Sequence, residues 1–330
     1  MSQTQRPRFD AVGFGALNMD CLYRVDRIVV DGETVIRESR QTPGGSAANT
    51  IYGLAKLGLK TGFVGAVGDD AIGRAMIDEF AGLGADTTRI KIKPGSPSGA
   101  VFGLTDAQGH RSLYILPGAN SRLNAADINM AYFSQLRLLH ISSFVDEAQF
   151  RLSLDIVNGL ASNVMLSFSP GALYAEKGID AIAPILARTD ILLVNWEELE
   201  TVTGLTDVRG VSACRAAGCR TVVLTLGAGR SINRGNAKAT PTVAYVSDAN
   251  SNFFVEPIPA LHPVADTVGA GDAFAAGYLH GILTGKPPET CGRIGAIVAA
   301  FSVRGIGARA GLPTLAELSA RYRGLYGKDL

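Results

Sequence analysis

The chain has 330 residues, which suits one large α/β domain or a core with a small appendage better than two full domains. Its 31 lysine and arginine residues balance 30 aspartate and glutamate residues, and only 18% of all residues are charged, so we expect no basic face for nucleic acid. The 39 glycines occur beside 47% hydrophobic residues, which indicates tight turns and close backbone approaches rather than disorder.

The first part of the chain alternates strands and helices. Residues 11–17 are an apolar run typical of a buried strand, and Asn18 and Asp20 follow at its end, where a sheet presents polar side chains to a ligand. A Pro-Gly-Gly-Ser turn at residues 43–46 leads into a helix with one apolar face, and residues 61–83 repeat the strand and the helix. This alternation predicts βαβ units and therefore a parallel sheet.

The alternation breaks at a predicted hairpin. Residues 100–105 and 111–116 are short apolar stretches on either side of the turn sequence Asp-Ala-Gln-Gly. We interpret this hairpin, together with a segment nearer the N-terminus, as a small β appendage that serves as a lid, made of about residues 23–42 and 98–117. The rest fits a single domain, so we treat residues 1–330 as one unit.

Strands and helices alternate again in the second half of the chain. Strands are predicted at residues 138–142, 164–169, 191–194 and 221–226, with helices such as 148–160 and 199–203 between them and further β structure at 239–258. Three helices are predicted at residues 271–284, 289–303 and 315–326.

The cysteines and the apolar content bear on location. The four cysteines lack the spacings of a zinc site or a C-x-x-C motif, so we expect small buried thiols in a reducing compartment; they are Cys21, Cys214, Cys219 and Cys291. No stretch reaches the roughly 18 apolar residues of a membrane span, and residues 1–10 lack the apolar segment of a leader. We therefore expect a soluble cytoplasmic protein with no membrane partner.

The most informative segment places small residues at the start of a long apolar helix. Gly269, Ala270 and Gly271 let a ligand approach the backbone, and the N–H groups at a helix N-terminus attract anions. Asp272 stands at the same point, where an acid alone is a favourable first-turn residue. Because phosphoryl transfer needs an anion site beside a base, the combination predicts that Asp272 is the base of such a reaction.

Two further strand ends carry candidate ligand groups. Asn195 and Glu198 follow the strand at 191–194 and can hold Mg²⁺ through water, since this hard ion prefers oxygen ligands. The same N-x-x-E spacing is also a plain helix-capping arrangement, so both interpretations stay open. Thr225 and Gly227 end another strand in a glycine-rich turn, which also fits an ordinary turn.

Other motifs are missing from the chain. The P-loop sequence G-x-x-x-x-G-K-[ST] does not occur, and no G-x-G triplet completes G-x-G-x-x-G. The G-x-S-x-G elbow and the H-E-x-x-H helix are also missing. A P-loop NTPase, a nicotinamide oxidoreductase and these hydrolase classes therefore lose support.

Together these residues resemble the ribokinase/PfkB family of carbohydrate and nucleoside kinases, over roughly residues 12–313. The resemblance implies a three-layer α/β fold: a mostly parallel central sheet, helices on both faces and a small β lid. The first matching elements are the strand end and the GGSAAN segment at 44–49, which is similar to the family's first signature. In the family these elements approach the substrate; the matching residues here are Asn18, Asp20, Gly44, Gly45 and Asn49.

The later elements of the resemblance concern the phosphoryl donor. The segment at 266–272 is similar to the family's second signature, with Asp272 in the place of the catalytic base. The resemblance implies ATP as donor, Mg²⁺ beside Asn195 and Glu198, and nucleotide contacts at two positions, Thr225 and Gly227. It also implies a loop for a monovalent cation, K⁺, at Asp266, Val268, Ser302 and Gly307.

Three positions depart from the family pattern. Ser46 stands where many ribokinases have lysine, which puts ribose itself in doubt. Gly229 comes one residue before the glycine that the family places at the position of Arg230, so the purine contact is expected to differ. Ser169 precedes Pro170 where Asp or Asn is common.

We therefore predict an ATP-dependent kinase that phosphorylates a hydroxymethyl group of a sugar or sugar-like substrate. A nucleoside kinase of the same family is the main alternative, and a sugar- or nucleoside-binding regulator without turnover is a further one. Expected partners are the small-molecule substrate and a second copy of the chain through the β lid. The candidate side chains with which the lid covers the substrate are Ala100, Phe102, Leu113 and Ile115.

Overall fold

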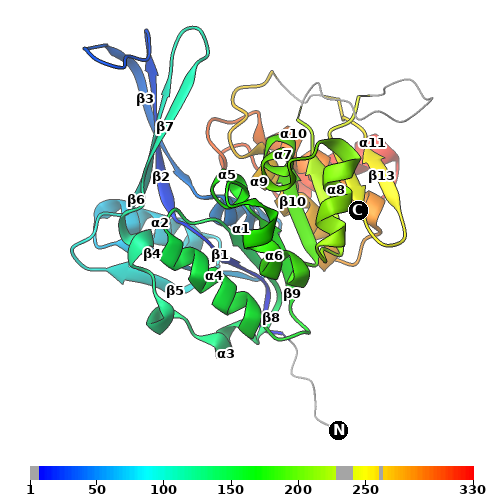
Figure 1. Cartoon of the computed structure of the whole chain (residues 1–330). Coiled ribbons are helices and arrows are strands. Elements are labelled where there is room, and N and C mark those ends of the chain that lie inside the picture. Colours follow the sequence, from blue (N-terminus) through cyan, green and yellow to red (C-terminus); the bar gives the residue numbers. More distant parts are fainter. Residues whose placement is uncertain (1–6, 228–240, 260–262) are drawn as a thin grey trace.

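A large sheet at the centre of the molecule carries helices on both faces, and a smaller sheet projects from it (Figure 1). The computed structural model describes residues 7–227, 241–259 and 263–330. The predicted three-layer α/β fold with a small β lid is thereby confirmed.

Over the described residues, the large sheet has nine strands in the order β13-β12-β11-β10-β9-β8-β1-β4-β5. The seven strands from β11 to β5 pair in parallel, and β12 and β13 add an antiparallel edge. The strands are β1 (Phe9–Phe14), β4 (Thr61–Gly68), β5 (Asp86–Lys93), β8 (Leu136–Ser142), β9 (Met165–Ser169), β10 (Ile191–Asn195), β11 (Thr221–Thr225), β12 (Ala244–Ser247) and β13 (Asn252–Val255). The alternating polar residues of β5 kept it out of the sequence prediction, because it is an edge strand with one face toward solvent.

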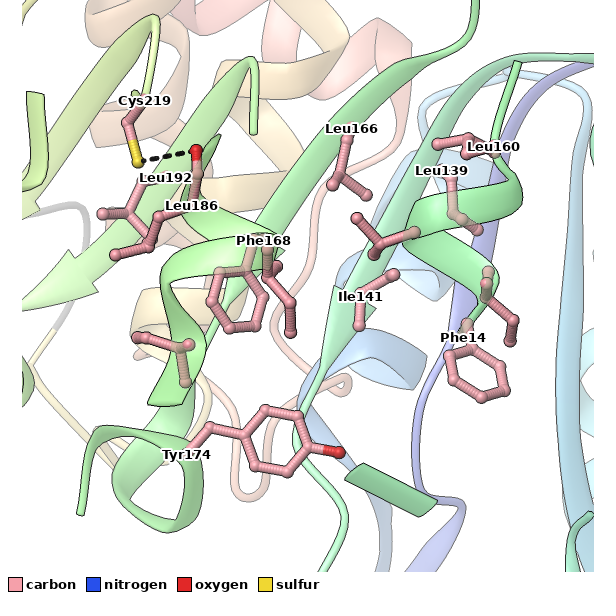
Figure 2. Packing of buried hydrophobic residues seen from close by; sticks show 14 of the residues in the cluster. Phe14, Leu139, Ile141, Leu160, Leu166, Phe168, Tyr174, Leu186, Leu192 and Cys219 are labelled. Carbon is pink, nitrogen blue, oxygen red and sulfur yellow. Dashed lines mark hydrogen bonds between the residues drawn. The ribbon is translucent and has the colours of Figure 1, made fainter. Parts of the chain in front are cut away.

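One face of the large sheet is covered by a series of short helices. Figure 2 shows the core on this face, where Phe14, Ile141, Phe168 and Leu192 project from four neighbouring strands to meet side chains such as Tyr174. The elements on this face are α3 (Met130–Phe133), α4 (Glu147–Gly159), α5 (Gly171–Ala175), α6 (Gly178–Arg188), α7 (Trp196–Thr203) and α8 (Asp207–Ala216).

The opposite face carries the helices that position the candidate site. Side chains of α1 (Ser46–Lys56), α2 (Ala71–Gly82) and α9 (Ala270–Leu283) pack there against Phe63 and Leu138 of the sheet. The helices α10 (Pro288–Ser302) and α11 (Leu315–Tyr326) pack outside α9 and form a third core. The predicted C-terminal helices are confirmed to within a few residues.

The small sheet has four strands among the described residues, in the order β3-β2-β6-β7. They are β2 (Asn18–Val25), β3 (Ile36–Gly44), β6 (Gly99–Thr105) and β7 (Arg111–Leu116). The prediction that a buried strand runs from residue 11 to residue 17 is therefore wrong at its end: β1 stops at Phe14, and Asn18 and Asp20 already belong to the lid. The Asn120 amide causes the change of sheet, because it pairs with both the N–H and the C=O of Leu17.

The strand register decides which lid side chains face the site. Asp20 pairs with Val101, which pairs with Ile115, so these side chains share one face of the small sheet. Leu113 lies on that face too, and its contact with the substrate stays a prediction. Ala100 and Phe102 lie on the opposite face, so their predicted contact with the substrate is wrong.

The structure also describes the state of the cysteines and the character of the helices. All four cysteines are buried free thiols, as predicted. In the part of the chain that the structure describes, none of the helices is both long and apolar enough to cross a membrane.

Candidate active site

Asp272 lies in the first turn of α9 and faces α1. Its carboxylate accepts a hydrogen bond from the Ser46 hydroxyl at 2.8 Å and another from the Asn49 amide at 2.9 Å. Burial raises the pKa of Asp272 to about 6, while these two donors and the Arg309 guanidinium act to lower it. The carboxylate is thus ionised near neutral pH and still basic enough to accept a proton.

The N-terminus of α9 presents free backbone donors beside this carboxylate. Gly269 caps the helix at φ +74°, and a Cβ there would meet Ala308 at 2.3 Å, so the position requires glycine. The Ala270 N–H already donates to the Thr267 carbonyl at 3.2 Å, so it is not a free donor for the predicted anion site. Over the described residues, the N–H groups of Gly271 and Asp272 have no backbone partner and remain available to an anion.

Two glycines shape the turn between β3 and α1. Gly45 has φ +96°, and a Cβ on it would meet the Ala16 carbonyl oxygen at 2.2 Å. A Cβ on Gly44 would meet the Asp20 carboxylate at 2.4 Å. The paired glycines therefore let the lid strand carrying Asp20 approach the start of α1.

Asp20 is a second partly buried carboxyl group of the site. Burial raises its pKa to about 6; Arg309 and Arg111 lower it, and the charge of Asp272 raises it. The predicted clamp residues Asn18 and Asp20 differ in their freedom to bind a ligand. The Asn18 side-chain oxygen already accepts from the Asn120 amide at 3.0 Å, whereas none of the described residues donates a hydrogen bond to the Asp20 carboxylate.

Two cavities meet at Ser46. The first, of about 120 Å³, lies under the lid and is lined by residues that include Asn18, Gly45, Ile115, Asn120 and Asp146. The second, of about 70 Å³, lies over the carboxyl ends of β10 and β11 and is lined by residues that include Asn195, Glu198, Thr225, Gly271 and Asp272. Ser46 therefore lines both cavities, while Asp272 lines the second one, at the N-terminus of α9, and accepts the Ser46 hydrogen bond there.

Asn195 and Glu198 form a reciprocal capping box at the start of α7. The Asn195 N–H donates to Glu198 Oε2 at 3.0 Å, and the Glu198 N–H donates to Asn195 Oδ1 at 2.8 Å. Burial raises the pKa of Glu198 to about 7, and the charge of Asp272 adds to this effect. The structural interpretation of this motif is thus confirmed, and the second carboxylate oxygen of Glu198 is left for another ligand.

The Asp266 loop is tied to the loop after α10 by direct hydrogen bonds. The Asp266 carboxylate accepts from the Val268 N–H at 3.0 Å and from the Gly307 N–H at 2.9 Å. The Ser302 carbonyl accepts from Gly305 at 3.2 Å. The four residues predicted for a monovalent cation therefore lie in adjoining loops. In the described residues, no cluster of three or more His, Cys, Asp or Glu side chains suits a metal ion.

The predicted nucleotide turn is described only in part. The Thr225 hydroxyl donates to the Val194 carbonyl at 3.3 Å, and Gly227 has φ +62° with open space around it. Gly229 and Arg230 lie outside the described residues. Thr225 therefore joins the cavity of Asp272 and Glu198, while the predicted change in the purine contact stays a prediction.

Sequence motifs missed three polar residues of this region. The Ser142 hydroxyl accepts from the Ala47 N–H at 3.0 Å, Asn120 links the lid to residue 17, and Arg309 contacts Asn49. Each lies outside the two signature segments at 44–49 and 266–272 and touches the site only through the folded chain. A polar residue at the end of the apolar strand β8 was the one available signal, and it pointed to Ser142.

Comparison with known proteins decides the family. Residues 9–315 match the model of the pfkB family of carbohydrate kinases. The chain belongs to this family. It is a phosphotransferase that acts on an alcohol group, as predicted.

Individual relatives agree with this assignment. A protein described as an uncharacterized sugar kinase from Archaeoglobus fulgidus is 34% identical over 79% of this chain and 98% of its own length. A ribokinase from Haemophilus influenzae is 29% identical over 92% of this chain and 95% of its own. The solved nucleoside kinase of Methanocaldococcus jannaschii superposes with a TM-score of 0.79 over 97% of this chain and 100% of its own, at 20% identity, and shows the same fold.

Glu198→Gln is expected to change how stability depends on pH. The pKa of Glu198 rises from 4.5 to about 7 on folding, so the stability that its protonated form contributes is lost as the pH rises through about 7. Gln keeps an oxygen for the Asn195 N–H and carries no charge. The variant should therefore gain about 1–2 kcal/mol of unfolding free energy over wild type between about pH 5 and about pH 8.

Chemical denaturation at the two pH values measures this gain. Glu200→Gln is the matched control, because Glu200 is exposed on the same helix and is not among the groups that shift the Glu198 pKa. Equal pH dependence in wild type and Glu198→Gln would contradict the raised pKa.

Proposed function

We propose that this pfkB-family kinase transfers the γ-phosphoryl group of ATP to a hydroxymethyl group of a sugar or nucleoside, with Asp272 as the general base. The observation that carries the proposal is the Asp272 carboxylate in the second cavity, beside the free N–H groups of α9 and hydrogen-bonded to Ser46, which also lines the lid-side cavity. We also infer that residues 1–330 act as one kinase domain with the small sheet as its lid.

The proposed mechanism follows from these positions. Asp272 takes the proton of the acceptor hydroxyl while the hydroxyl oxygen forms a bond to the γ-phosphorus and the bond to the β,γ-bridging oxygen breaks. ADP leaves with the bridging oxygen, and the proton stays on Asp272 until it passes to solvent. The N–H groups of Gly271 and Asp272 donate to the oxygens of the transferring group, where negative charge is concentrated.

Mg²⁺ fits the second cavity through its donor set. Glu198 supplies a carboxylate oxygen that is free of the capping box, and Asn195 lies beside it, so both suit a hard cation held through water. When bound, the ion neutralises charge on the donor phosphates. Thr225 lies in the same cavity and is expected to contact the nucleotide. A K⁺ site at Asp266, Val268, Ser302 and Gly307 stays a prediction.

The acceptor class is left open between sugars and nucleosides. Ser46 replaces the family's frequent lysine and is committed to Asp272 by a 2.8 Å hydrogen bond. The lid face over the cavity is apolar at Val101, Leu113 and Ile115, which suits a sugar ring or a base. A phosphorylation screen over ribose, fructose, ketodeoxygluconate, adenosine, cytidine and inositol tests the proposal. If the rate of ATP consumption with every one of these acceptors equals the rate without acceptor, the result favours a binding regulator over a kinase of this class.

The outer face of the lid supports the proposed homodimer. Phe102, Tyr114 and Leu116 share this face and are partly or largely exposed, although they are large and apolar. A second lid packed against them would remove this area from water. Sedimentation equilibrium of the full chain gives the oligomeric state directly.

Asp272→Asn is expected to lower kcat by about 10²–10⁴-fold, because the amide keeps the shape of the side chain and loses its basicity. Binding of the nucleotide and of the acceptor should persist, which isothermal titration of each ligand checks. Turnover within a few-fold of wild type would rule Asp272 out as the base.

Gly271→Val is expected to raise the KM for ATP by about tenfold or more, the scale of a lost hydrogen bond to a charged group. No protein atom lies within 4 Å of a Cβ at this position, so the side chain projects into the cavity without disturbing the fold. Circular dichroism checks the fold, and Gly269→Val, where a Cβ meets Ala308, is the contrasting variant expected to unfold. An unchanged KM in folded Gly271→Val would place the anion site elsewhere.

Asp20→Ala is expected to raise KM for every acceptor with a vicinal diol, since a desolvated pair of hydroxyls loses its acceptor at a cost of about 1–3 kcal/mol. Asp26→Ala is the control, because Asp26 lies exposed on the same lid and pairs with Arg37. Phosphorylation of ketodeoxygluconate alone, with no effect of Asp20→Ala, would contradict the diol clamp.

A further inference from the structure

Arg309 is a buried cation in the loop after α10, and neither the sequence motifs nor the proposed mechanism uses it. Its side chain is 4% exposed. The guanidinium Nε–H donates to Asn49 Oδ1 at 2.9 Å, one terminal nitrogen donates to the Gly44 carbonyl at 3.2 Å, and the other pairs with Glu79 of α2. Three acceptors from three segments therefore converge on one residue.

Two aromatic rings hold the guanidinium from the sides. Its central carbon lies 5.0 Å from the ring centroid of Tyr52 and 5.3 Å from that of Phe80. Tyr52 belongs to α1 and Phe80 to α2, so Arg309 fills the space between these helices and the signature turn. A long side chain packed in this way has few alternative rotamers, and its donors are held in fixed directions.

These contacts determine which way the Asn49 amide faces. A guanidinium can only donate hydrogen bonds, and an ionised carboxylate can only accept them. Asn49 lies between the two, with its oxygen on Arg309 and its NH₂ group on Asp272. With Arg309 present, the amide has one satisfactory orientation; without it, the amide oxygen can turn toward Asp272, which tolerates that contact only when it is protonated.

We propose that Arg309 is the positioning residue of the site: it fixes the Asn49 amide as a donor to Asp272 and holds the Gly44 turn against the lid. The inference rests on the proposed function, in which Asp272 must be ionised to act. Arg309 acts through Asn49 and contacts neither the acceptor cavity nor the donor cavity as a lining residue.

Two other charged groups near Asp272 disfavour its ionised form, in contrast to Arg309. Asp20 of β2 and Glu198 of α7 each interact unfavourably with the Asp272 charge, whereas Arg309 favours it. Glu79 partly offsets the Arg309 charge, and Arg111 of β7 acts on Asp20. Loss of Arg309 therefore leaves Asp272 among carboxylates, and its pKa should rise.

The decisive measurement is the titration of the Asp272 carboxyl carbon by ¹³C NMR in the full-length protein. Asp272→Asn assigns the resonance by its disappearance. In Arg309→Met, which removes the donors and the charge while keeping an apolar stem, the midpoint should rise by about one pH unit. Arg309→Lys keeps the charge but cannot reach all three acceptors, so its midpoint should lie between those of wild type and Arg309→Met.

Arg304→Met is the matched control. Arg304 lies in the same loop, donates to Glu317 and to the Gly311 carbonyl, and lies over the Phe301 ring, but has no contact with Asn49 or Asp272 in the described structure. If loop arginines had a purely structural role, the Asp272 titration midpoint would shift equally in Arg304→Met and Arg309→Met. If Arg309→Met fails to fold because Glu79 loses its partner, Arg309→Met with Glu79→Gln removes both charges and takes its place.

Kinetics give a second readout with whichever of ribose, fructose, adenosine or cytidine the wild type phosphorylates. The acidic limb of kcat should move upward with the Asp272 midpoint, so the loss of activity is larger at about pH 6 than at about pH 9. An unchanged NMR midpoint in Arg309→Met, or an equal shift in Arg304→Met, overturns the positioning role. Retained turnover in Asp272→Asn contradicts the proposed base instead, and the NMR result still decides the role of Arg309.

Discussion

The site depends on how the protein accommodates carboxylates around two small adjoining cavities. Burial raises the pKa of Asp20, Asp272 and Glu198 alike, and the Asp272 charge raises the pKa of the other two. Such a cluster favours protonation unless donors or cations compensate it. Ser46 and Asn49 supply donors to Asp272, which explains how a carboxylate between its neighbours can remain ionised near neutral pH.

The glycines of the site satisfy a second requirement, the close approach of backbone segments. Gly45 in a left-handed conformation lies against the Ala16 carbonyl, Gly44 lies against Asp20, and Gly269 lies against Ala308. Each contact joins the lid or a loop to a helix N-terminus at a separation that a Cβ would prevent. Gly271 differs, because its Cβ would project into open space. The fold therefore does not require a small residue at this position.

Periodicity and local turn chemistry predicted the layers of the fold, because a buried parallel sheet and its helices leave strong apolar patterns. The edge strand β5 was not predicted, since its alternating polar residues resemble a loop. The lid was placed too late because residues 15–17 continue the apolar run of β1 up to Asn18 without a visible break. Glycine-rich segments predicted Asp272 and its neighbours. The face of the small sheet on which Ala100 and Phe102 lie could not be predicted, because a shift of one residue in register moves every side chain of a strand to the other face.

Arg309 shows why part of a site escapes local patterns altogether. It is 260 positions from Asn49 in the chain, while Asn49 and Ser46 are more than 220 positions from Asp272. No motif at residue 309 signals a contact with an amide that only the folded sheet brings near. Because these hydrogen bonds join α1, α9 and the last loop, the Asp272 carboxylate acquires its environment only after the nine-stranded sheet has brought both ends of the described chain together. Folding and the ionisation of Asp272 are in this way linked through the same few contacts.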